Sequence, residues 1–399
     1  MLNVLVPHAE VSQKAWTYRQ TVPTLSPMGV DLRIFVEASY AMYMGDNPLH
    51  SNYNSPPLAA WVFFPFNLMS YEMAYEVQFT VITVANFAAL VLLFFLLRSA
   101  YLATAAPDPV PVCILGLAFL AACFSQFSGY PFEFSLERGN YDSLALLAIC
   151  SGAWLVRYRP TACWLQVLLF SFAAHLKIYP AILLFIPLWQ HGLRALLPLT
   201  LINASMLFCF GFDRGMEFLV GLYHYSLHPY IWAGNHSAAA FATLVLEPRL
   251  ASLLPAKAVH VVAITLLLML PLALWIYGTM KLLRHGFSGK NTILAISLAT
   301  PLMCILTSVS NDYKLVILIL PACLCLVHYG LGYVHNGKLA DLLGVTATLL
   351  CLLLAARSVL LPPLLWITNK YPVVLLLEIL TCIAALHETR HAGPSRYSS

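Results

Sequence analysis

Charged residues are scarce in this chain, and their scarcity excludes an ordinary water-soluble domain. Of 399 residues only 10% are Asp, Glu, Lys or Arg, whereas 60% are hydrophobic and the mean hydropathy is +0.79. Soluble globular domains carry about 25% charged residues, so this chain cannot cover a water-facing surface with charge. Lipid must therefore be the solvent for most of the protein.

Other features are missing as well. The net charge of +4 comes without a basic run, which excludes a typical nucleic-acid binder. Residues 1–20 lack the continuous apolar region of about 7–15 residues that marks a secretory signal peptide. The ten cysteines all fall in apolar segments without metal-ligand spacing, so we interpret them as small lipid-facing or core residues, not as disulfides or zinc ligands. We predict neither a metal nor another cofactor.

Long apolar runs predict an all-α, polytopic transmembrane helix bundle. A spanning helix needs about 20 mostly apolar residues. Candidate spans lie at 77–97, 110–126, 141–157, 194–211, 256–280, 291–308, 313–330, 340–358 and 371–387. The stretch 161–190 is also apolar, but "AAHLKIYP" divides it into two arms of a hairpin. With the arms counted separately, the sequence predicts about 11 crossings.

The predicted spans divide the chain into five parts and give it an orientation. These parts are an N-terminal segment with the first outer loop (1–76), helices with outer-face polar turns (77–211), a large outer loop (212–255), C-terminal helices (256–387) and a cytoplasmic tail (388–399). A cytoplasmic C-terminus puts most short Lys- and Arg-bearing loops inside, as the positive-inside rule requires. The segment 55–69 is apolar but too short to span, so we expect interfacial helices there.

In this orientation the unusual polar clusters all face outward. They are residues 31–55, "FEFSLERGNYDS" at 132–143, the "HLKIYP" tip, the loop 212–250 and "SVSNDYK" at 308–314. A transport path would place polar residues at several depths of the membrane. Clustering at one face instead indicates a cavity that its substrates reach from that face.

The first cluster has two interpretations. Asp31 precedes a helix-like run and could simply cap it, while Arg33 and Glu37 could pair across one helical turn. Alternatively, Asp31 could act as a general base that takes a proton from a sugar hydroxyl. In that case Arg33, Glu37 and Asp46 become candidate sugar or acceptor contacts.

The cluster "LERGNYDS" also has two interpretations. Glu137, Arg138 and Asp142 could form a salt-bridged helix start. In the functional alternative Arg138 grips a phosphate with its planar fork, and Asn140 and Asp142 bind sugar hydroxyls.

Lys177 lies at the predicted hairpin tip, where a cation is costly unless it reaches water or meets an anion. It could therefore snorkel, or it could bind a lipid-borne phosphate.

Two later clusters add candidates for sugar recognition. Asn311, Asp312 and Lys314 form either a polar turn or a substrate contact. The loop 212–250 holds amides, aromatics and histidines that suit sugar faces, with His236 the candidate contact.

Taken in order, these motifs resemble the bacterial polyprenol-phosphate-mannose-dependent alpha-mannosyltransferases, a family of membrane GT-C glycosyltransferases. The resembling segments are "DLRIFVEASYAMYMGDNPL…YNSPPLAAWVFFPF", "ERGNYDSLALL", "HLKIYPAILL" and "SNDYKLVILILP", and together they cover most of 28–325. The last departs from the family's histidine-rich late loop. The family usually also has a span before its aspartate, and residues before Asp31 hold no run that could cross.

The resemblance implies a GT-C-like fold and an inverting hexosyltransferase of the cytoplasmic membrane, with its active site facing the exterior. A mannose-like sugar would pass from a polyprenyl-phosphate donor to a glycan or lipid-linked acceptor. By this resemblance Asp31 is the catalytic base and Lys177 contacts the donor phosphate. We also predict Arg138 at the donor phosphate and Tyr53 among the sugar or acceptor contacts. The alternative is a non-catalytic flippase for lipid-linked sugars or a small-solute transporter, which would place polar residues through the bilayer and show internal repeats.

Overall fold

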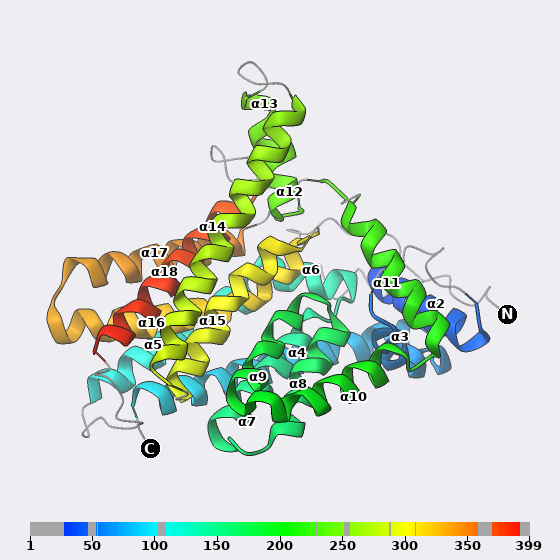
Figure 1. Cartoon of the computed structure of the whole chain (residues 1–399), viewed down its shortest axis with the longest axis horizontal. Helices are drawn as coiled ribbons and strands as arrows, with labels where there is room; N and C mark the ends of the chain where they lie inside the picture. The colour runs from blue at the N-terminus through cyan, green and yellow to red at the C-terminus, as the bar shows by residue number, and fades with distance from the viewer. Residues whose placement is uncertain are drawn as a thin grey trace. The chain divides into compact units, whose positions relative to one another are not determined.

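The structure is a computed structural model, and it is almost wholly helical (Figure 1). It describes residues 28–46, 53, 55–102, 109–227, 230–232, 234–250, 256–286, 289–307, 309–357 and 369–391. In this part of the chain the only pairing of extended segments is an isolated antiparallel bridge between Asn235 and Asn311. The chain divides into two compact units, which we describe separately.

Unit 1 comprises residues up to 89, 130–152 and 163–228. Its elements are α2 (Val30–Met44), α3 (Pro57–Phe63), η3 (Phe64–Leu68), the first part of α4 (Tyr71–Tyr101), α6 (Tyr130–Arg138), most of α7 (Asp142–Tyr158), α8 (Cys163–Leu176), η4 (Tyr179–Leu184), α9 (Phe185–His191), η5 (Gly192–Ala195), α10 (Leu196–Leu207) and α11 (Phe212–Leu227).

Unit 2 comprises residues 90–129, 153–162 and 229 onward. Its elements are the rest of α4 and α7, α5 (Pro109–Phe127), α12 (Ala238–Phe241), η6 (Ala242–Leu246), α13 (Glu247–Leu250), α14 (Ala256–Arg284), α15 (Gly289–Leu306), η7 (Asp312–Leu318), α16 (Ile319–Asn336), α17 (Leu339–Ala356) and α18 (Tyr371–His391).

Among the described residues, eight helical stretches are long and apolar enough to cross a membrane. They are Tyr71–Tyr101, Pro109–Phe127, Tyr179–Leu207, Ile264–Arg284, Gly289–Leu306, Asp312–Asn336, Leu339–Ala356 and Tyr371–Arg390. The multi-pass helical architecture predicted from the sequence is confirmed, but the count of about 11 is not. The expected span 141–157 forms a helix of 17 residues and the first hairpin arm one of 14. The second arm continues into the next expected span as the 29-residue stretch Tyr179–Leu207.

The core of unit 1 packs around α2. Buried Leu32, Phe35 and Val36 of α2 contact Phe63 of α3 and Tyr141, which precedes α7. The ring of Phe35 lies 5.1 Å from that of Phe63 and 4.6 Å from that of Tyr141. Burying large aromatic side chains stabilises such a contact by area and by edge-to-face geometry. As expected, residues 57–68 form an apolar helix too short to span.

Two glycines allow the start of α2 to approach the turn after α6. Gly29 caps α2 in the left-handed region at φ 76°, and Gly139 has φ 67°. A Cβ on Gly139 would lie 2.7 Å from the Cβ of Leu32, and one on Gly29 would lie 2.7 Å from the ring of Tyr75. Only glycine fits both the backbone angles and the spacing.

The first turns of α4 fasten both of these segments. The hydroxyl of Tyr71 donates to the carbonyl oxygens of Met28 and Gly29, at 2.5 and 2.8 Å. The hydroxyl of Tyr75 donates to the carbonyl of Leu136 at 2.9 Å, and Gln78 donates to the carbonyl of Gly139 at 3.2 Å. The residues around Asp31 are thus held by hydrogen bonds from a long membrane helix.

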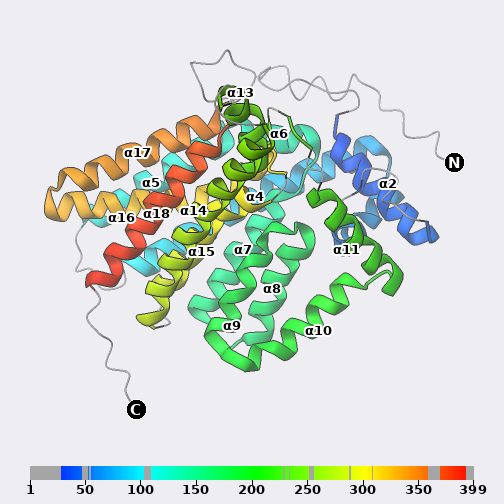
Figure 2. The ribbon, with the colours of Figure 1, turned by 45° about the horizontal axis from the view of Figure 1, so that its top comes forward.

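Unit 2 is a bundle of α5 and α14–α18. The helices α16, α17 and α18 lie side by side in both ribbon views, and α15 packs against α14, α16 and α18 (Figures 1 and 2). Residues 292–305 of α15 are buried throughout. At one end of this bundle Lys290 pairs with Glu388 at 2.7 Å. The opposite end, where η7 and α18 begin, carries the polar network described below.

Candidate functional site

Asp31 lies in the first turn of α2 and is partly exposed. It is not the helix cap, because Gly29 occupies that position and no side chain caps the helix. Instead its Oδ2 accepts a hydrogen bond from the Nδ2 of Asn140 at 2.7 Å. The capping alternative for Asp31 is therefore wrong, and its carboxylate is aimed at the cluster around Asn140.

Asn140 holds this carboxylate from a rigid position. The residue is buried, and its Oδ1 accepts a hydrogen bond from the backbone N–H of Tyr141 at 2.8 Å. This contact orients the amide so that its NH₂ group faces Asp31. Because both ends of the amide are engaged within the protein, Asn140 orients Asp31.

Asp142 begins α7 two residues later and is fully buried. Its Oδ1 accepts a hydrogen bond from the hydroxyl of Tyr179 at 2.6 Å, and its Oδ2 lies 3.4 Å from the Nζ of Lys177. Buried charges need partners of this kind. Asp142 thus anchors the segment between α8 and η4 to the start of α7.

Lys177 connects this anchor to the aromatic core. Its Nζ lies 4.2 Å from the ring centre of Tyr141 and 5.5 Å from that of Phe35, and its side chain is 13% exposed. Burial disfavours the charged ammonium, but Asp142, Tyr141 and Asp31 outweigh it and raise the pKa of Lys177. The side chain is a fixed cation that still reaches the surface, rather than a freely snorkelling lysine.

The charges of this cluster also act on Asp31. Burial raises the pKa of Asp31 above its ordinary value, while the Asn140 hydrogen bond and the positive charges of Lys177 and Arg138 oppose the rise. Arg138 lies 3.0 Å from buried Glu137 and stacks over the ring of Phe134. A carboxylate with a raised pKa is a better base near neutral pH.

The remaining first-loop candidates lie around this cluster without joining it. Arg33 and Glu37 pair at 2.7 Å on α2, as the sequence spacing predicted. Asp46 is exposed beyond the end of α2. Tyr53 is buried, and its hydroxyl donates to the carbonyl of Pro56 at 2.7 Å, so it stabilises the start of α3.

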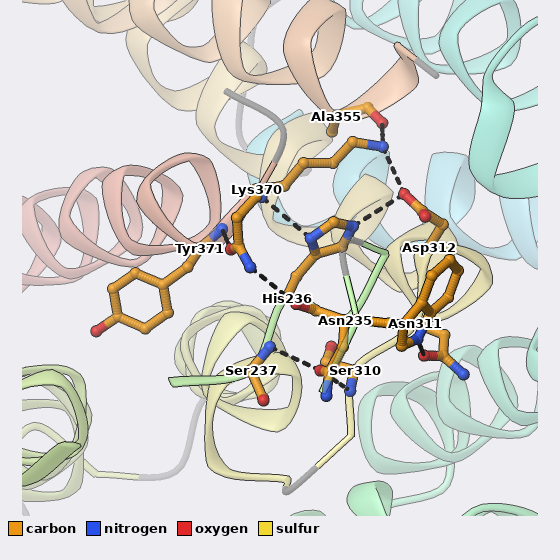
Figure 3. A network of polar contacts seen from close by, with 11 residues as sticks. Asn235, His236, Ser237, Ser310, Asn311, Asp312, Ala355, Lys370 and Tyr371 are labelled. Atoms are coloured by element: carbon orange, nitrogen blue, oxygen red, sulfur yellow. Dashed lines mark hydrogen bonds and ion pairs between the residues drawn. The ribbon is translucent and has the colours of Figure 1, made fainter. Parts of the chain in front are cut away.

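Unit 2 holds the later candidates in a separate network (Figure 3). The Oδ1 of Asp312 lies 2.9 Å from the Nε2 of His236 and 2.8 Å from the Nζ of Lys370. The backbone N–H of Lys370 donates to the Nδ1 of His236, which assigns the proton of the neutral imidazole to Nε2. Burial lowers the pKa of His236, although Asp312 opposes this shift. All three side chains are sealed from solvent.

The same network joins three chain segments. Asn235 accepts hydrogen bonds from the backbone N–H groups of Ser237 and Ser310, and the amide of Asn369 donates to its carbonyl. Asn311 accepts from the indole N–H of Trp232 at 3.0 Å. Lys314 is buried and donates to Thr307 and Val309 within its own loop. The network therefore fixes the loops at one end of the unit 2 bundle.

Sequence reasoning missed Lys370 and Tyr179. Lys370 precedes a predicted span and looks like an ordinary flanking cation. One sequence signal could have indicated Lys370: Lys177-Ile-Tyr-Pro and Lys370-Tyr-Pro both precede apolar helices. In the structure each of these lysines pairs with an aspartate at the start of another helical element. Among the histidines and aromatics of the predicted loop 212–250, His224 and Tyr230 are exposed, and His228 lies outside the described residues.

The two lysine–aspartate pairs differ in accessibility. Lys370 is 2% exposed and Asp312 is fully buried, whereas Lys177 keeps 13% of its side chain exposed near a partly exposed Asp31. Of these two pairs, only the one in unit 1 keeps part of its cation accessible to a ligand in the folded protein. Within the described part of the chain no three His, Cys, Asp or Glu side chains converge as a metal site requires.

The fold and this cluster define a multi-pass helical membrane protein with a polar site at the ends of its helices. Residues 53–308 match the sequence profile of Glycosyltransferase family 87, so the chain belongs to this family of glycosyltransferases. The match includes Arg138, Asn140, Asp142 and Lys177, whereas Asp31 precedes it and Asp312 follows it. A search of curated proteins found no match.

Proposed function

We propose that the protein transfers a mannose-like sugar from a polyprenyl-phosphate donor to a glycan or lipid-linked acceptor, with inversion of the anomeric centre. The family supplies the reaction class. The single observation that supports the finer assignment is the unit 1 cluster, in which Asn140 holds the carboxylate of Asp31 and Lys177 pairs with Asp142, which begins α7 two residues after Asn140.

In this mechanism Lys177 and Arg138 bind the donor phosphate. Lysine supplies a compact point charge, and arginine a planar fork. As the sugar–phosphate bond breaks, the leaving polyprenyl phosphate gains negative charge, and cations already in position stabilise it without reorganisation. Asp142 and Tyr179 hold the segment that carries Lys177, so Asp142 acts in positioning instead of in the sugar contact expected from the sequence.

Asp31 is the general base. Its carboxylate takes the proton of the acceptor hydroxyl as that oxygen attacks the anomeric carbon, and the phosphate leaves with the bonding electrons of the old bond. One displacement inverts the configuration. Asn140 keeps Oδ2 of Asp31 oriented, so its proposed role is also positioning. Its burial supports this role over the direct sugar contact expected from the sequence.

Lipid-borne substrates fit the setting of the cluster. Asp31, Asp142 and Lys177 all lie at the ends of helices of a multi-pass protein, where a polyprenyl chain could remain in the bilayer while its phosphate meets the cations. The moderate positive-inside bias of the loops favours the exterior face. Arg33, Glu37 and Asp46 remain candidate acceptor contacts on or next to α2.

A panel of donors tests this assignment. Purified protein in nanodiscs is offered polyprenyl-phosphate mannose, polyprenyl-phosphate glucose and the corresponding nucleotide sugars, with a simple mannoside as acceptor. We expect transfer only from the polyprenyl phosphates, and NMR of the product should show inverted anomeric configuration. Transfer from the nucleotide sugars alone, or retention of configuration, would overturn the proposal.

A further inference from the structure

The helix α11 exposes an apolar stripe that the proposed chemistry does not use. The helix is amphipathic, and five apolar side chains at helical spacing form one outward face. They are Phe212 (66% exposed), Met216 (40%), Leu219 (40%), Val220 (52%) and Tyr223 (62%). Gly215 and Phe218 lie beside this face and are buried against the rest of unit 1. A stripe of this size in water would be unfavourable.

The connection to α10 places the beginning of α11 at the membrane boundary. The stretch Tyr179–Leu207 is long and apolar enough to span, and it exposes Leu197 and Leu201. Only residues 208–211 join its end to α11, and four residues reach at most about 14 Å. α11 itself is about 24 Å long at 1.5 Å per residue, and it contains Asp213, Arg214 and Glu217, so it cannot cross the bilayer core of about 30 Å.

The turn between the helices is built to change direction. In both ribbon views α11 leaves the end of α10 at a sharp angle (Figures 1 and 2). The ring of Phe208 stacks on that of Phe212 with centres 5.1 Å apart. A Cβ on Gly215 would lie 2.3 Å from the ring of Phe208, so glycine at this position allows the ring to pack against α11.

The polar side of α11 is attached to α2. Arg214 pairs with Glu217 at 2.7 Å and donates to the carbonyl oxygen of Gly45, which is the C-cap residue of α2. A cation at a helix C-terminus interacts favourably with the helix dipole. This contact joins α11 to the helix that carries Asp31.

We propose that α11 lies in the membrane–water interface with its apolar stripe in lipid. The occupant of the stripe is the bilayer itself. An exposed apolar helix face with charged residues on the other side, beginning within one turn of a span, has the composition of an interfacial helix.

Photo-crosslinking of the full-length protein tests this placement. Benzoylphenylalanine is introduced separately at Met216 and Tyr223 on the stripe, and at their sequence neighbours Glu217 and His224 on the other side. Each variant is illuminated in nanodiscs of phosphatidylethanolamine and phosphatidylglycerol, and adducts are identified by mass spectrometry. Thermal unfolding and size-exclusion profiles matching the unmodified protein select the variants that are interpreted.

We expect lipid adducts at 216 and 223 in several-fold excess over 217 and 224. Three outcomes would overturn the proposal: crosslinks from 216 and 223 to a second copy of the chain, equal lipid labelling at all four positions, or no lipid adduct at the stripe. The readout involves no sugar transfer, so it stands independently of the proposed reaction.

Discussion

Replacing Lys177 by methionine keeps the length of the side chain but removes its charge. If this lysine merely snorkelled, the replacement would be neutral or slightly stabilising. The structure predicts the opposite, because Lys177 pairs with Asp142, which is fully buried. Removing one partner of a buried pair leaves an uncompensated charge and costs about 3–5 kcal/mol. We therefore expect Lys177→Met to lower the thermal unfolding temperature in detergent.

Loss of stability alone would hide the role of Lys177 in donor binding. The double variant Lys177→Met/Asp142→Asn removes both charges and keeps a carbonyl that can accept from Tyr179. Replacing both partners of a buried pair with neutral groups is often close to neutral, so most of the lost stability should return. Donor affinity should remain weaker by about 1.5–3 kcal/mol, the contribution of a hydrogen bond to a charged group. That loss is about 10- to 150-fold in Kd.

Unit 2 supplies the matched control. Lys370→Met/Asp312→Asn removes the sealed pair, and it should leave donor affinity unchanged per folded molecule. Affinity is measured by equilibrium binding of a fluorescent polyprenyl phosphate to protein in nanodiscs. Normal affinity in a well-folded Lys177→Met/Asp142→Asn variant would refute the donor-phosphate role. An equal loss in both double variants would mean that any buried pair affects binding only through stability.

Three further predictions follow from the cluster and the topology. Asp31→Asn should lower turnover about 10²- to 10⁴-fold with donor binding retained. Because burial raises the pKa of Asp31, the native protein should lose stability relative to the variant as pH rises from about 3.9 through that pKa. Equal unfolding free energies of the two proteins across this pH range would contradict the pKa shift. Asn140→Leu removes a hydrogen bond that lowers the pKa of Asp31, so the acid limb of the variant's pH–rate profile should lie at higher pH than that of the native protein. A cysteine at Glu217 should react with an impermeant thiol reagent on intact cells and one at His285 should not; the reverse pattern would place the site inside.

The membrane architecture could be predicted from apolar length, but the count of about 11 crossings is not confirmed. The helix α7 has 17 residues and α8 has 14, which is shorter than the about 20 residues of a typical span. The second hairpin arm and the expected span 194–211 join into the stretch Tyr179–Leu207, in which the turn η5 connects α9 to α10. Local turns of this kind have no clear hydropathy signal.

The residues of the unit 1 cluster were recognised individually, whereas their partners were not. Asp31 and Asn140 are 109 positions apart, and Asp142 and Tyr179 are 37 apart. No periodicity links such positions, so the sequence left a capping role for Asp31 open. The contact between Asp31 and Asn140 depends on Gly29 and Gly139, which allow the start of α2 to lie close to the turn after α6.

The two lysine–aspartate pairs differ in a way that fits the proposed phosphate site in unit 1 and a structural clamp in unit 2. In unit 2 the carboxylate of Asp312 meets both Lys370 and His236, and the lysine also donates to the carbonyl of Ala355, so its charge is used within the fold. In unit 1 the lysine lies at 3.4 Å from its carboxylate, which Tyr179 shares. A longer ion pair holds the ammonium charged while leaving it better able to attract a second anion. In the proposed mechanism, pairing keeps the cation stable without a ligand, and the partial exposure of Lys177 gives a phosphate access to it.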